Sequence, residues 1–298
     1  MINVSGLTKN YGDRVAVDTM DFDVAAGKVT GFVGPNGAGK STAMRMMVGL
    51  TRPDAGEVRY SGVKYTDLLH PARVVGSVLD ARAMHPGRSA RNHLRAMAAV
   101  SGIAAARVDE VLHTVGLETA AKQRAGGFSL GMRQRLALAG ALLGDPEVLL
   151  LDEPANGLDP DGIRWLRNYL RDFADQGGTV FVSSHLISEL SMFADDLVVI
   201  GGGRLVAADS LRNITARNDV AVIVETPQPE DLVALLGTHD IANESTGDRL
   251  IIRGQTREAV SQLAFDHRIR LTELTETSKS LEDTLLDMTS ASAEFASA

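Results

Sequence analysis

The chain has 298 residues, of which 44% are apolar and 23% are charged, and its formal net charge is −8. This length is sufficient for one large domain with its own core and a smaller second domain. The net negative charge argues against a broad nucleic-acid-binding surface, because neutralising phosphates requires clustered Lys and Arg. Since the chain has no cysteine, disulfides, thiolate zinc sites and thiol nucleophiles are excluded.

Membrane-directed segments are not evident in the sequence. The segment Met1–Gly6 lacks the charged start and apolar stretch of a signal peptide. The richest apolar runs, Val148–Leu151 and Leu197–Ile200, are far shorter than the roughly 18 residues that a spanning helix needs. We therefore expect another chain to supply any membrane-spanning part.

The first part of the chain predicts the opening unit of a parallel α/β domain. Short strands are expected at Asn3–Val4, Val15–Val17 and Phe22–Val24. A strand over Lys28–Val33 then leads through a glycine-rich loop into a helix over Ser41–Val48, which is the pattern of such a unit.

The middle of the chain predicts a helical insertion followed by more parallel sheet. From about Arg91 to Leu143 apolar residues recur at helical spacing. Buried parallel strands and the helices between them are then expected at Val148–Leu151, Ile163–Asp175, Thr179–Ser183, Leu186–Phe193 and Leu197–Ile200.

The pattern of apolar and polar residues changes again near Asn218. It predicts a first domain over residues 1–217, with its helical insertion at about 81–145, and a small α+β domain over residues 218–298. Strands are expected at Val220–Val224, Leu250–Ile252 and Ile269–Leu274. Helices are expected at Leu232–Leu236, Arg257–Leu263 and Ser280–Met288.

The glycine-rich loop carries the first chemical motif, of the form G-x-x-x-x-G-K-S/T. Its residues are Gly34, Pro35, Asn36, Gly37, Ala38, Gly39, Lys40, Ser41 and Thr42. Glycines let successive backbone N–H groups converge on phosphate oxygens, and the helix that follows adds its positive dipole end. Lys40 can contact the β- and γ-phosphates, and Ser41 can offer its hydroxyl to Mg²⁺. The motif predicts a nucleoside triphosphate site.

Two acids, Asp152 and Glu153, follow the apolar strand Val148–Leu151. In proteins with such a phosphate loop, a carboxylate at this position holds Mg²⁺ opposite the loop, and we assign that role to Asp152. Glu153 points in a different direction and can act as general base toward the attacking water.

With these motifs in this order, residues 1 to about 215 resemble the ABC ATPase family. The resemblance implies a P-loop NTPase fold of the α/β class, with a RecA-like core, an N-terminal antiparallel β subdomain and a helical insertion. It also implies that Tyr11 stacks on adenine. His185 is similar in position to the switch histidine, which contacts the γ-phosphate and the catalytic glutamate, and Asn156–Asp159 resembles the segment that joins two protomers.

The segment Phe128–Arg135 resembles the family signature, usually L-S-G-G-Q. Ser129 and Gly131 match it, whereas Leu130 replaces a glycine. The resemblance implies that Ser129 meets the γ-phosphate held by another protomer. A second departure is Asp80, which stands where the family usually has a Gln, and we expect it to address Mg²⁺ or the attacking water.

The resemblance further implies partners and a location. One phosphate loop and one signature per chain imply a head-to-tail homodimer around two ATP molecules with Mg²⁺, or pairing with another ATPase. An integral-membrane permease is expected to dock against Asp80–Leu94 and to hold the subunit at the cytoplasmic face of the membrane. No nucleic acid partner is expected. Asp80 and the signature are more similar to exporters of the antibiotic- and peptide-resistance kind than to importers.

Two other readings remain open at this stage. A soluble ABC protein acting on the ribosome or DNA usually has two cassettes or a long coiled-coil insertion, and this chain has neither. A P-loop kinase or other transferase would leave the segment at Ser129 and His185 without a role.

Overall fold

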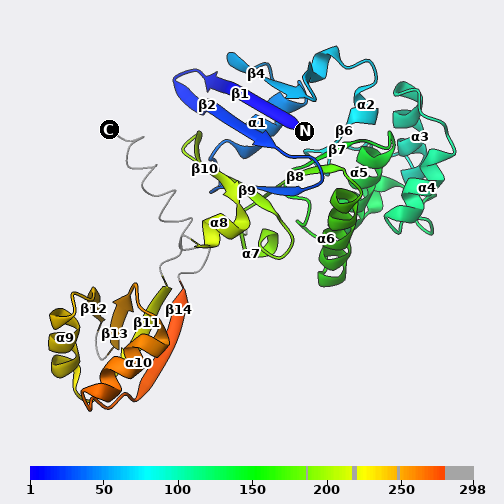
Figure 1. The fold of residues 1–298 in the computed structure, drawn as a ribbon. Coiled ribbons are helices and arrows are strands. Elements are labelled where there is room, and N and C mark those ends of the chain that lie inside the picture. Colours follow the sequence, from blue (N-terminus) through cyan, green and yellow to red (C-terminus); the bar gives the residue numbers. More distant parts are fainter. Residues whose placement is uncertain (186, 217–219, 247–248, 279–298) are drawn as a thin grey trace. The chain divides into compact units, whose positions relative to one another are not determined.

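A computed structural model describes residues 1–185, 187–216, 220–246 and 249–278 (Figure 1). The chain divides into two compact units, the first ending at Leu211 and the second beginning at Arg212. The first unit contains two sheets and the second contains one, and each unit has its own hydrophobic core. No helix within the described ranges is both long enough and apolar enough to cross a membrane.

A six-stranded sheet forms the centre of the first unit, in the order β10-β9-β3-β8-β7-β6. All neighbours in it are parallel except β10, which is antiparallel to β9. The strands are β3 (Val29–Val33), β6 (Val75–Val78), β7 (Val148–Leu151), β8 (Thr179–Ser184), β9 (Asp196–Gly201) and β10 (Arg204–Ser210). Every residue of β3, β7 and β8 is buried, as is typical of parallel strands that are covered on both faces.

A second, antiparallel sheet lies beside it, in the order β2-β1-β4-β5. Its strands are β1 (Ile2–Tyr11), β2 (Arg14–Val24), β4 (Ala55–Tyr60) and β5 (Val63–Lys64). The core lies between the two sheets, where the Phe181 ring from the central sheet stacks on Phe22 at 5.7 Å and contacts Phe32 at 4.9 Å. This is the expected N-terminal antiparallel subdomain of an α/β fold.

The prediction of separate short strands at Val15–Val17 and Phe22–Val24 is wrong, because β2 runs through both. Its pairing with β1 is irregular, with register shifts on either side of Leu7, and Thr19 has a φ of 49°. Such irregularities interrupt the alternation of side chains from which strand length is estimated.

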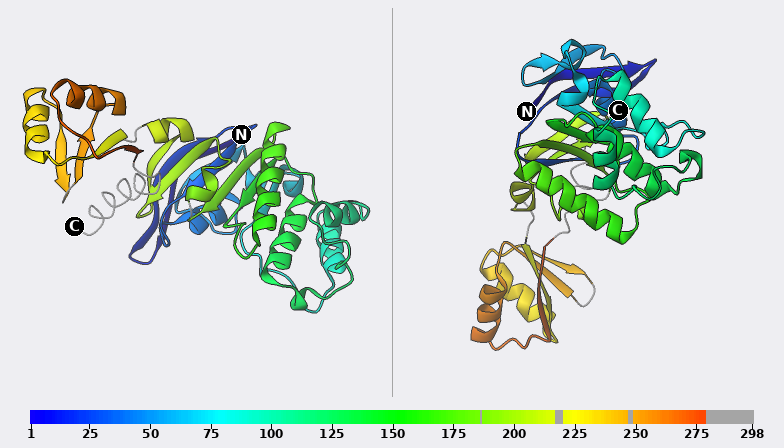
Figure 2. Two further views of the ribbon diagram at one scale, coloured as in Figure 1. Left: turned by 90° about the horizontal axis from the view of Figure 1, so that it is seen from below. Right: turned by 90° about the vertical axis from the view of Figure 1, so that its right-hand side faces the viewer.

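The helices of the first unit are α1 (Lys40–Met47), α2 (Pro71–Val74), α3 (Ala90–Val100), α4 (Arg107–Thr114), α5 (Leu130–Leu142), α6 (Pro160–Asp175) and α7 (Ile187–Leu190), with 3₁₀ turns η1 (Tyr65–Asp67) and η2 (Ala125–Gly127). The helices α3, α4 and α5 pack on one another and form the insertion, and α5 contacts β6 (Figures 1 and 2). The helix expected over Leu186–Phe193 is wrong in length, since α7 has only four residues. After α7 the chain turns, and the Asp195 carboxylate accepts the backbone N–H of Val29.

The boundary between the units falls within the first turn of α8 (Leu211–Ala216), and the second unit then follows a β-α-β-β-α-β order. Its elements are β11 (Val220–Glu225), α9 (Pro229–Thr238), β12 (Asn243–Thr246), β13 (Arg249–Arg253), α10 (Arg257–Asp266) and β14 (Glu273–Ser278). The sheet is antiparallel with order β12-β13-β11-β14, and buried side chains such as Val222, Leu236 and Ile252 form its core with the helices.

The strand predicted over Ile269–Leu274 is displaced, because β14 starts only at Glu273. Arg268 has a φ of 57°, and the N–H of Ile269 donates to the carbonyl of Ala264, so these residues end α10 instead of starting a strand. The helix expected over Ser280–Met288 lies outside the described residues.

Candidate functional site: a phosphate loop facing two carboxylates

The glycine-rich loop connects the end of β3 to the start of α1. Gly37 and Gly39 have φ values of 82° and 104°, which side chains rarely adopt. A β-carbon on Gly39 would overlap the carbonyl oxygen of Ala16, and one on Gly34 would overlap that of Ile200. Glycine is therefore required here both by backbone conformation and by close packing, which keeps the N-terminus of α1 open toward the loop.

Lys40 is the first residue of α1, and its side chain folds back over the loop. Its Nζ donates to the carbonyl oxygens of Gly34 at 2.5 Å and Pro35 at 3.3 Å, and only 7% of the residue is exposed. Burial lowers the pKa of the Lys40 ammonium, while the negative charges of Glu153 and Asp152 act in the opposite direction. The loop thus holds a cation in a fixed position opposite two carboxylates.

A hollow of about 410 Å³ opens over this loop. It is lined by Tyr11, Arg14, Ala16, Pro35, Asn36, Gly37, Ala38, Gly39, Lys40, Ser41, Thr42, Asp152 and Glu153. The structure therefore brings the aromatic ring, the phosphate loop and both acids into one place.

Arg14 is a residue of this hollow that the sequence did not single out. It pairs directly with Tyr11 across the hairpin between β1 and β2, so the two side chains share a face of the hairpin. A β-carbon on Gly37 would lie 3.7 Å from its guanidinium. Arg14 could have been found in the sequence from its position opposite the aromatic Tyr11 across the short Gly12-Asp13 turn.

Asp152 and Glu153 follow β7 directly, and both neighbouring strands hold them. The backbone N–H of Asp152 donates to the carbonyl of Val78 on β6 at 2.7 Å. On the other side, the Ser183 hydroxyl of β8 donates to Asp152 Oδ1 at 2.5 Å and accepts the N–H of Glu153 at 2.9 Å. Ser183 belongs to no motif in the sequence.

His185 follows β8 and reaches Glu153. Its Nδ1 lies 2.8 Å from Glu153 Oε2, and the side chains are 41% and 22% exposed respectively. The imidazole can therefore orient the carboxylate that faces the phosphate loop.

Ser129 and Gly131 stand at the start of α5 and are not among the residues that line the hollow of their own chain. The Ser129 hydroxyl caps α5 by accepting the N–H of Met132 at 3.2 Å. A β-carbon on Gly131 would lie 2.9 Å from the carbonyl of Gly157, and one on Gly157 would overlap the Leu130 side chain. Leu130, the departure from the family pattern, thus packs over the Asn156–Asp159 segment, whose Asp159 caps α6 by accepting the N–H of Gly162 at 2.8 Å.

Asp80 is not among the residues that line the hollow. It is exposed in the loop after β6, and its Oδ1 accepts the backbone N–H of Arg82 at 2.8 Å. The structure therefore does not bring Asp80 together with Ser41 and Asp152 in this hollow.

The residues near Lys40 fit a hydrated Mg²⁺. The Ser41 hydroxyl and the Asp152 carboxylate supply hard oxygen ligands, and Asp152 Oδ2 makes no hydrogen bond with the described residues. Within the described part of the chain no three His, Asp or Glu side chains gather as a metal cage. Mg²⁺ needs no such cage, because it keeps several waters and uses phosphate oxygens with one or two carboxylates.

Comparison with known protein families gives two matches along the chain. The family described as ABC transporter matches residues 17–156, and a domain of unknown function matches residues 220–282.

Among individual proteins, the bacitracin transport ATP-binding protein BcrA of Bacillus licheniformis is 35% identical over 292 residues, which cover 95% of each chain. The lantibiotic transport ATP-binding protein SrtF of Streptococcus pyogenes is 34% identical over 69% of this chain and 89% of its own. An uncharacterized ABC transporter ATP-binding protein of Bacillus subtilis, YhcH, is 35% identical over 97% of this chain and 96% of its own.

Solved structures agree with these matches. The ATP-binding subunit of an ABC transporter superposes with a TM-score of 0.67 at 25% identity, over 73% of this chain and 92% of its own. The cassette MJ0796, as a dimer in a post-hydrolysis state with ADP and Pi, superposes with a TM-score of 0.65 at 25% identity, over 71% and 99%.

Proposed function

The chain belongs to the ABC transporter ATP-binding proteins and is an ATP-hydrolysing subunit of that kind; from this premise we propose which residues perform the reaction and what the subunit drives. The observation that carries the proposal is the hollow in which Lys40 faces Asp152 and Glu153. We assign hydrolysis to residues 1–217 and an accessory role to residues 218–298.

The nucleotide lies along the hollow from Tyr11 to Lys40. The half-exposed Tyr11 ring offers a face on which adenine stacks, and such stacking contributes about 1–3 kcal/mol per base. Residues 34–42 enclose the phosphates with backbone N–H groups. The guanidinium of Arg14 adds a second positive charge beside Gly37.

Ser41 and Asp152 are the residues that would hold Mg²⁺. When bound, the ion would neutralise the charge that develops on the transferred phosphoryl group. Lys40 contributes a fixed charge to the same end, because its ammonium is already positioned by the loop.

Glu153 takes the proton of the attacking water, and His185 orients its carboxylate. The 2.8 Å contact between His185 Nδ1 and Glu153 Oε2 restricts the rotamer of the base. General-base catalysis of this kind contributes a factor of about 10²–10⁴ to the rate.

Ser129 acts in a second copy of the chain. It caps a helix whose N-terminus attracts anions, yet it does not line the hollow of its own chain. A head-to-tail homodimer would place Ser129 and Gly131 of each copy over the phosphates of the other, and the dimeric state of the MJ0796 cassette supports this arrangement.

A membrane permease receives the motion of this dimer. A groove of about 580 Å³ between α2, α3 and α5 displays the apolar side chains Leu69 and Val100, which are 86% and 90% exposed. Exposed apolar side chains at a groove are typical of a binding surface. Together with Asp80–Leu94 it offers a surface for a cytoplasmic helix of the permease, which would hold the subunit at the inner face of the membrane. The bacitracin and lantibiotic transport relatives support export of an antibiotic or peptide.

The direct test is phosphate release by the purified chain with Mg·ATP. Because two copies build each site, the activity per molecule should rise with protein concentration, and Lys40→Ala should abolish it. Activity that is independent of protein concentration would contradict the shared site. For the permease, the matched test is co-purification of the tagged chain with a multi-helix membrane protein, which Leu69→Asp together with Val100→Asp should weaken without changing the activity of the isolated subunit.

A further inference from the structure

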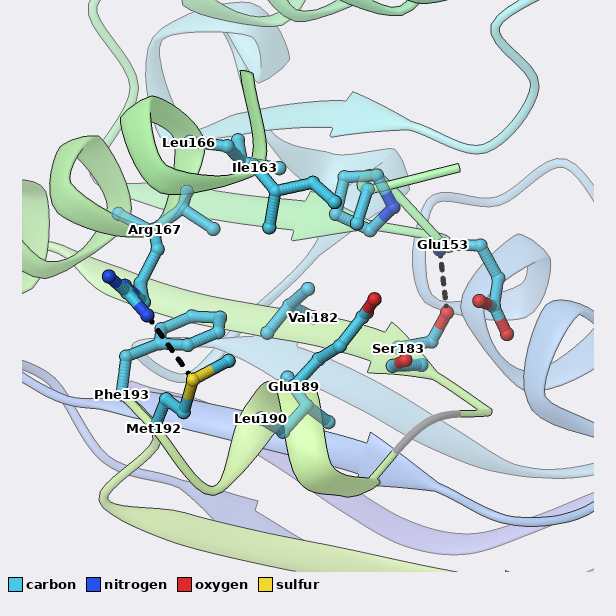
Figure 3. A pocket seen from close by; sticks show the side chains of 14 residues that line it. Glu153, Ile163, Leu166, Arg167, Val182, Ser183, Glu189, Leu190, Met192 and Phe193 are labelled. Atoms are coloured by element: carbon cyan, nitrogen blue, oxygen red, sulfur yellow. Dashed lines mark hydrogen bonds between the residues drawn. The ribbon is translucent and has the colours of Figure 1, made fainter. Parts of the chain in front are cut away.

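Ser183 lies between the two acids of the proposed catalytic site. It belongs to β8, a strand that is buried over its whole length, and the residue itself is 0% exposed. Figure 3 shows its side chain next to Glu153, with the hydrogen bond from the Glu153 N–H to its hydroxyl drawn as a dashed line. The hydroxyl therefore contacts Asp152 and Glu153 from a different strand.

The two hydrogen bonds of Ser183 perform different tasks. By donating to Asp152 Oδ1 at 2.5 Å, the hydroxyl restricts the rotamer of the carboxylate and leaves Oδ2 without a hydrogen bond from the described residues. By accepting the N–H of Glu153 at 2.9 Å, it pairs this donor just beyond the end of the β7–β8 ladder. The parallel pairing of β7 with β8 ends at Leu151 and Val182, and this N–H has a side-chain acceptor instead of a ladder carbonyl.

Glu153 also has an unusual backbone conformation. Its φ is 49°, in the left-handed region that residues with a side chain rarely occupy. Such a conformation costs free energy and persists only where surrounding contacts impose it. The bond to Ser183 is one such contact, and it aims the Glu153 side chain toward His185 and the phosphate loop.

We propose that Ser183 is a positioning residue of the ATPase reaction, which orients Asp152 toward Mg²⁺ and holds the strained backbone of the general base Glu153. This inference rests on the proposed Mg·ATP site. Ser183 acts through Asp152 and Glu153 without contacting the nucleotide. Outer partners of this kind typically change metal affinity or activity by about 10–100-fold when removed.

Three variants separate this role from a purely structural one. Ser183→Ala removes both hydrogen bonds. Ser183→Thr keeps the hydroxyl, and a cavity of about 30 Å³ that borders Ser183 offers space for the added methyl group (Figure 3). Thr30→Val on the adjacent strand β3 is the matched control, because Thr30 is 1% exposed and its hydroxyl makes no hydrogen bond with the described residues.

The main readout is the ratio of nucleotide affinities with Mg²⁺ and with EDTA, measured by equilibrium binding of a non-hydrolysable ATP analogue. Ser183→Ala should reduce the Mg²⁺-dependent gain about tenfold and lower kcat about tenfold or more, with affinity in EDTA unchanged. Ser183→Thr should restore the Mg²⁺-dependent gain, and Thr30→Val should behave as wild type.

Two outcomes would overturn the inference. One is a Ser183→Ala protein with the wild-type Mg²⁺ response and kcat. The other is an equal loss of affinity with and without Mg²⁺ that follows a lower unfolding temperature, which would leave Ser183 a structural role only. A wild-type protein that binds no nucleotide would instead overturn the proposed function, and this inference with it.

Discussion

Ser129→Ala tests whether one hydroxyl serves both its own helix and the active site of a second copy. Within its own chain Ser129 accepts the N–H of Met132 at 3.2 Å, and losing such a helix cap costs about 1 kcal/mol. In a unit of this size that loss lowers the unfolding temperature by roughly 2–4 °C. The proposed contact with the γ-phosphate of the other copy is a hydrogen bond to a charged group, worth about 1.5–3 kcal/mol. Since a dimer contains two such contacts, its dissociation constant should rise about 100-fold or more.

Ser89→Ala provides the matched control, because Ser89 caps α3 in the same way by accepting the N–H of Asn92 at 3.3 Å. Both variants should lose similar thermal stability, whereas only Ser129→Ala should lose dimer formation. The assay is sedimentation velocity with Mg·ATP in a background in which Glu153→Gln slows hydrolysis, with no permease present. Equal weakening of the dimer by both variants, or a normal dimer with Ser129→Ala, would refute the assignment of Ser129 to the site of the other copy.

Three further outcomes are expected. Lys40→Ala should weaken ATP binding about 10–100-fold by calorimetry, because each hydrogen bond to a charged group contributes about 1.5–3 kcal/mol. The variant should still fold, since the substitution removes a buried charge, and undiminished ATP affinity would contradict the phosphate role of Lys40. Gly39→Ala, at a φ of 104° and with its β-carbon against the Ala16 carbonyl, should lose more than about 2 kcal/mol in urea unfolding, and a stable variant would show that the loop tolerates another conformation. Tyr60→Phe removes a buried hydroxyl that donates to the Met47 carbonyl at 2.9 Å, so unfolding should become easier by about 1 kcal/mol without loss of nucleotide affinity; a loss of affinity with no loss of stability would place Tyr60 in the site instead.

The parts of the fold that could be predicted are those encoded locally. The run Val148–Leu151 is uniformly apolar, and the loop ending in Lys40 contains glycines that its conformation requires. In both places the local structure changes over a few residues. The hollow over the loop is lined by Lys40 together with Asp152 and Glu153, so the structure brings these predicted residues together.

The parts that could not be predicted depend on contacts between distant strands. Ser183 lies near the end of β8 with no motif around it, and only the pairing of β7 with β8 shows that its hydroxyl contacts Asp152. Arg14 is likewise placed by its hairpin with Tyr11. Asp80 is a different case, because its position in the sequence predicts a site residue but does not determine where its side chain points. Its carboxylate accepts the backbone N–H of Arg82.

Two strands that the sequence does not predict, β10 and β12, are partly exposed or polar. β10 (Arg204–Ser210) has only partly buried or exposed residues and is recognised by its antiparallel pairing with β9. β12 (Asn243–Thr246) is polar throughout and depends on β13 for its conformation. In both strands tertiary pairing decides the structure, since β propensity depends strongly on context.

The central claim is that Lys40, Asp152 and Glu153 form an ATP hydrolysis site which is complete only when two copies meet. Replacing Glu153 with Gln keeps the shape of the side chain and its proximity to His185 while removing the base, so turnover should fall by a factor of about 10²–10⁴. The most direct measurement is the mass of this variant in solution with Mg·ATP, by light scattering, alongside its phosphate release. The account predicts an ATP-dependent dimer that retains two ATP molecules. A variant that stays monomeric with saturating Mg·ATP, or that hydrolyses ATP at the wild-type rate, would contradict it.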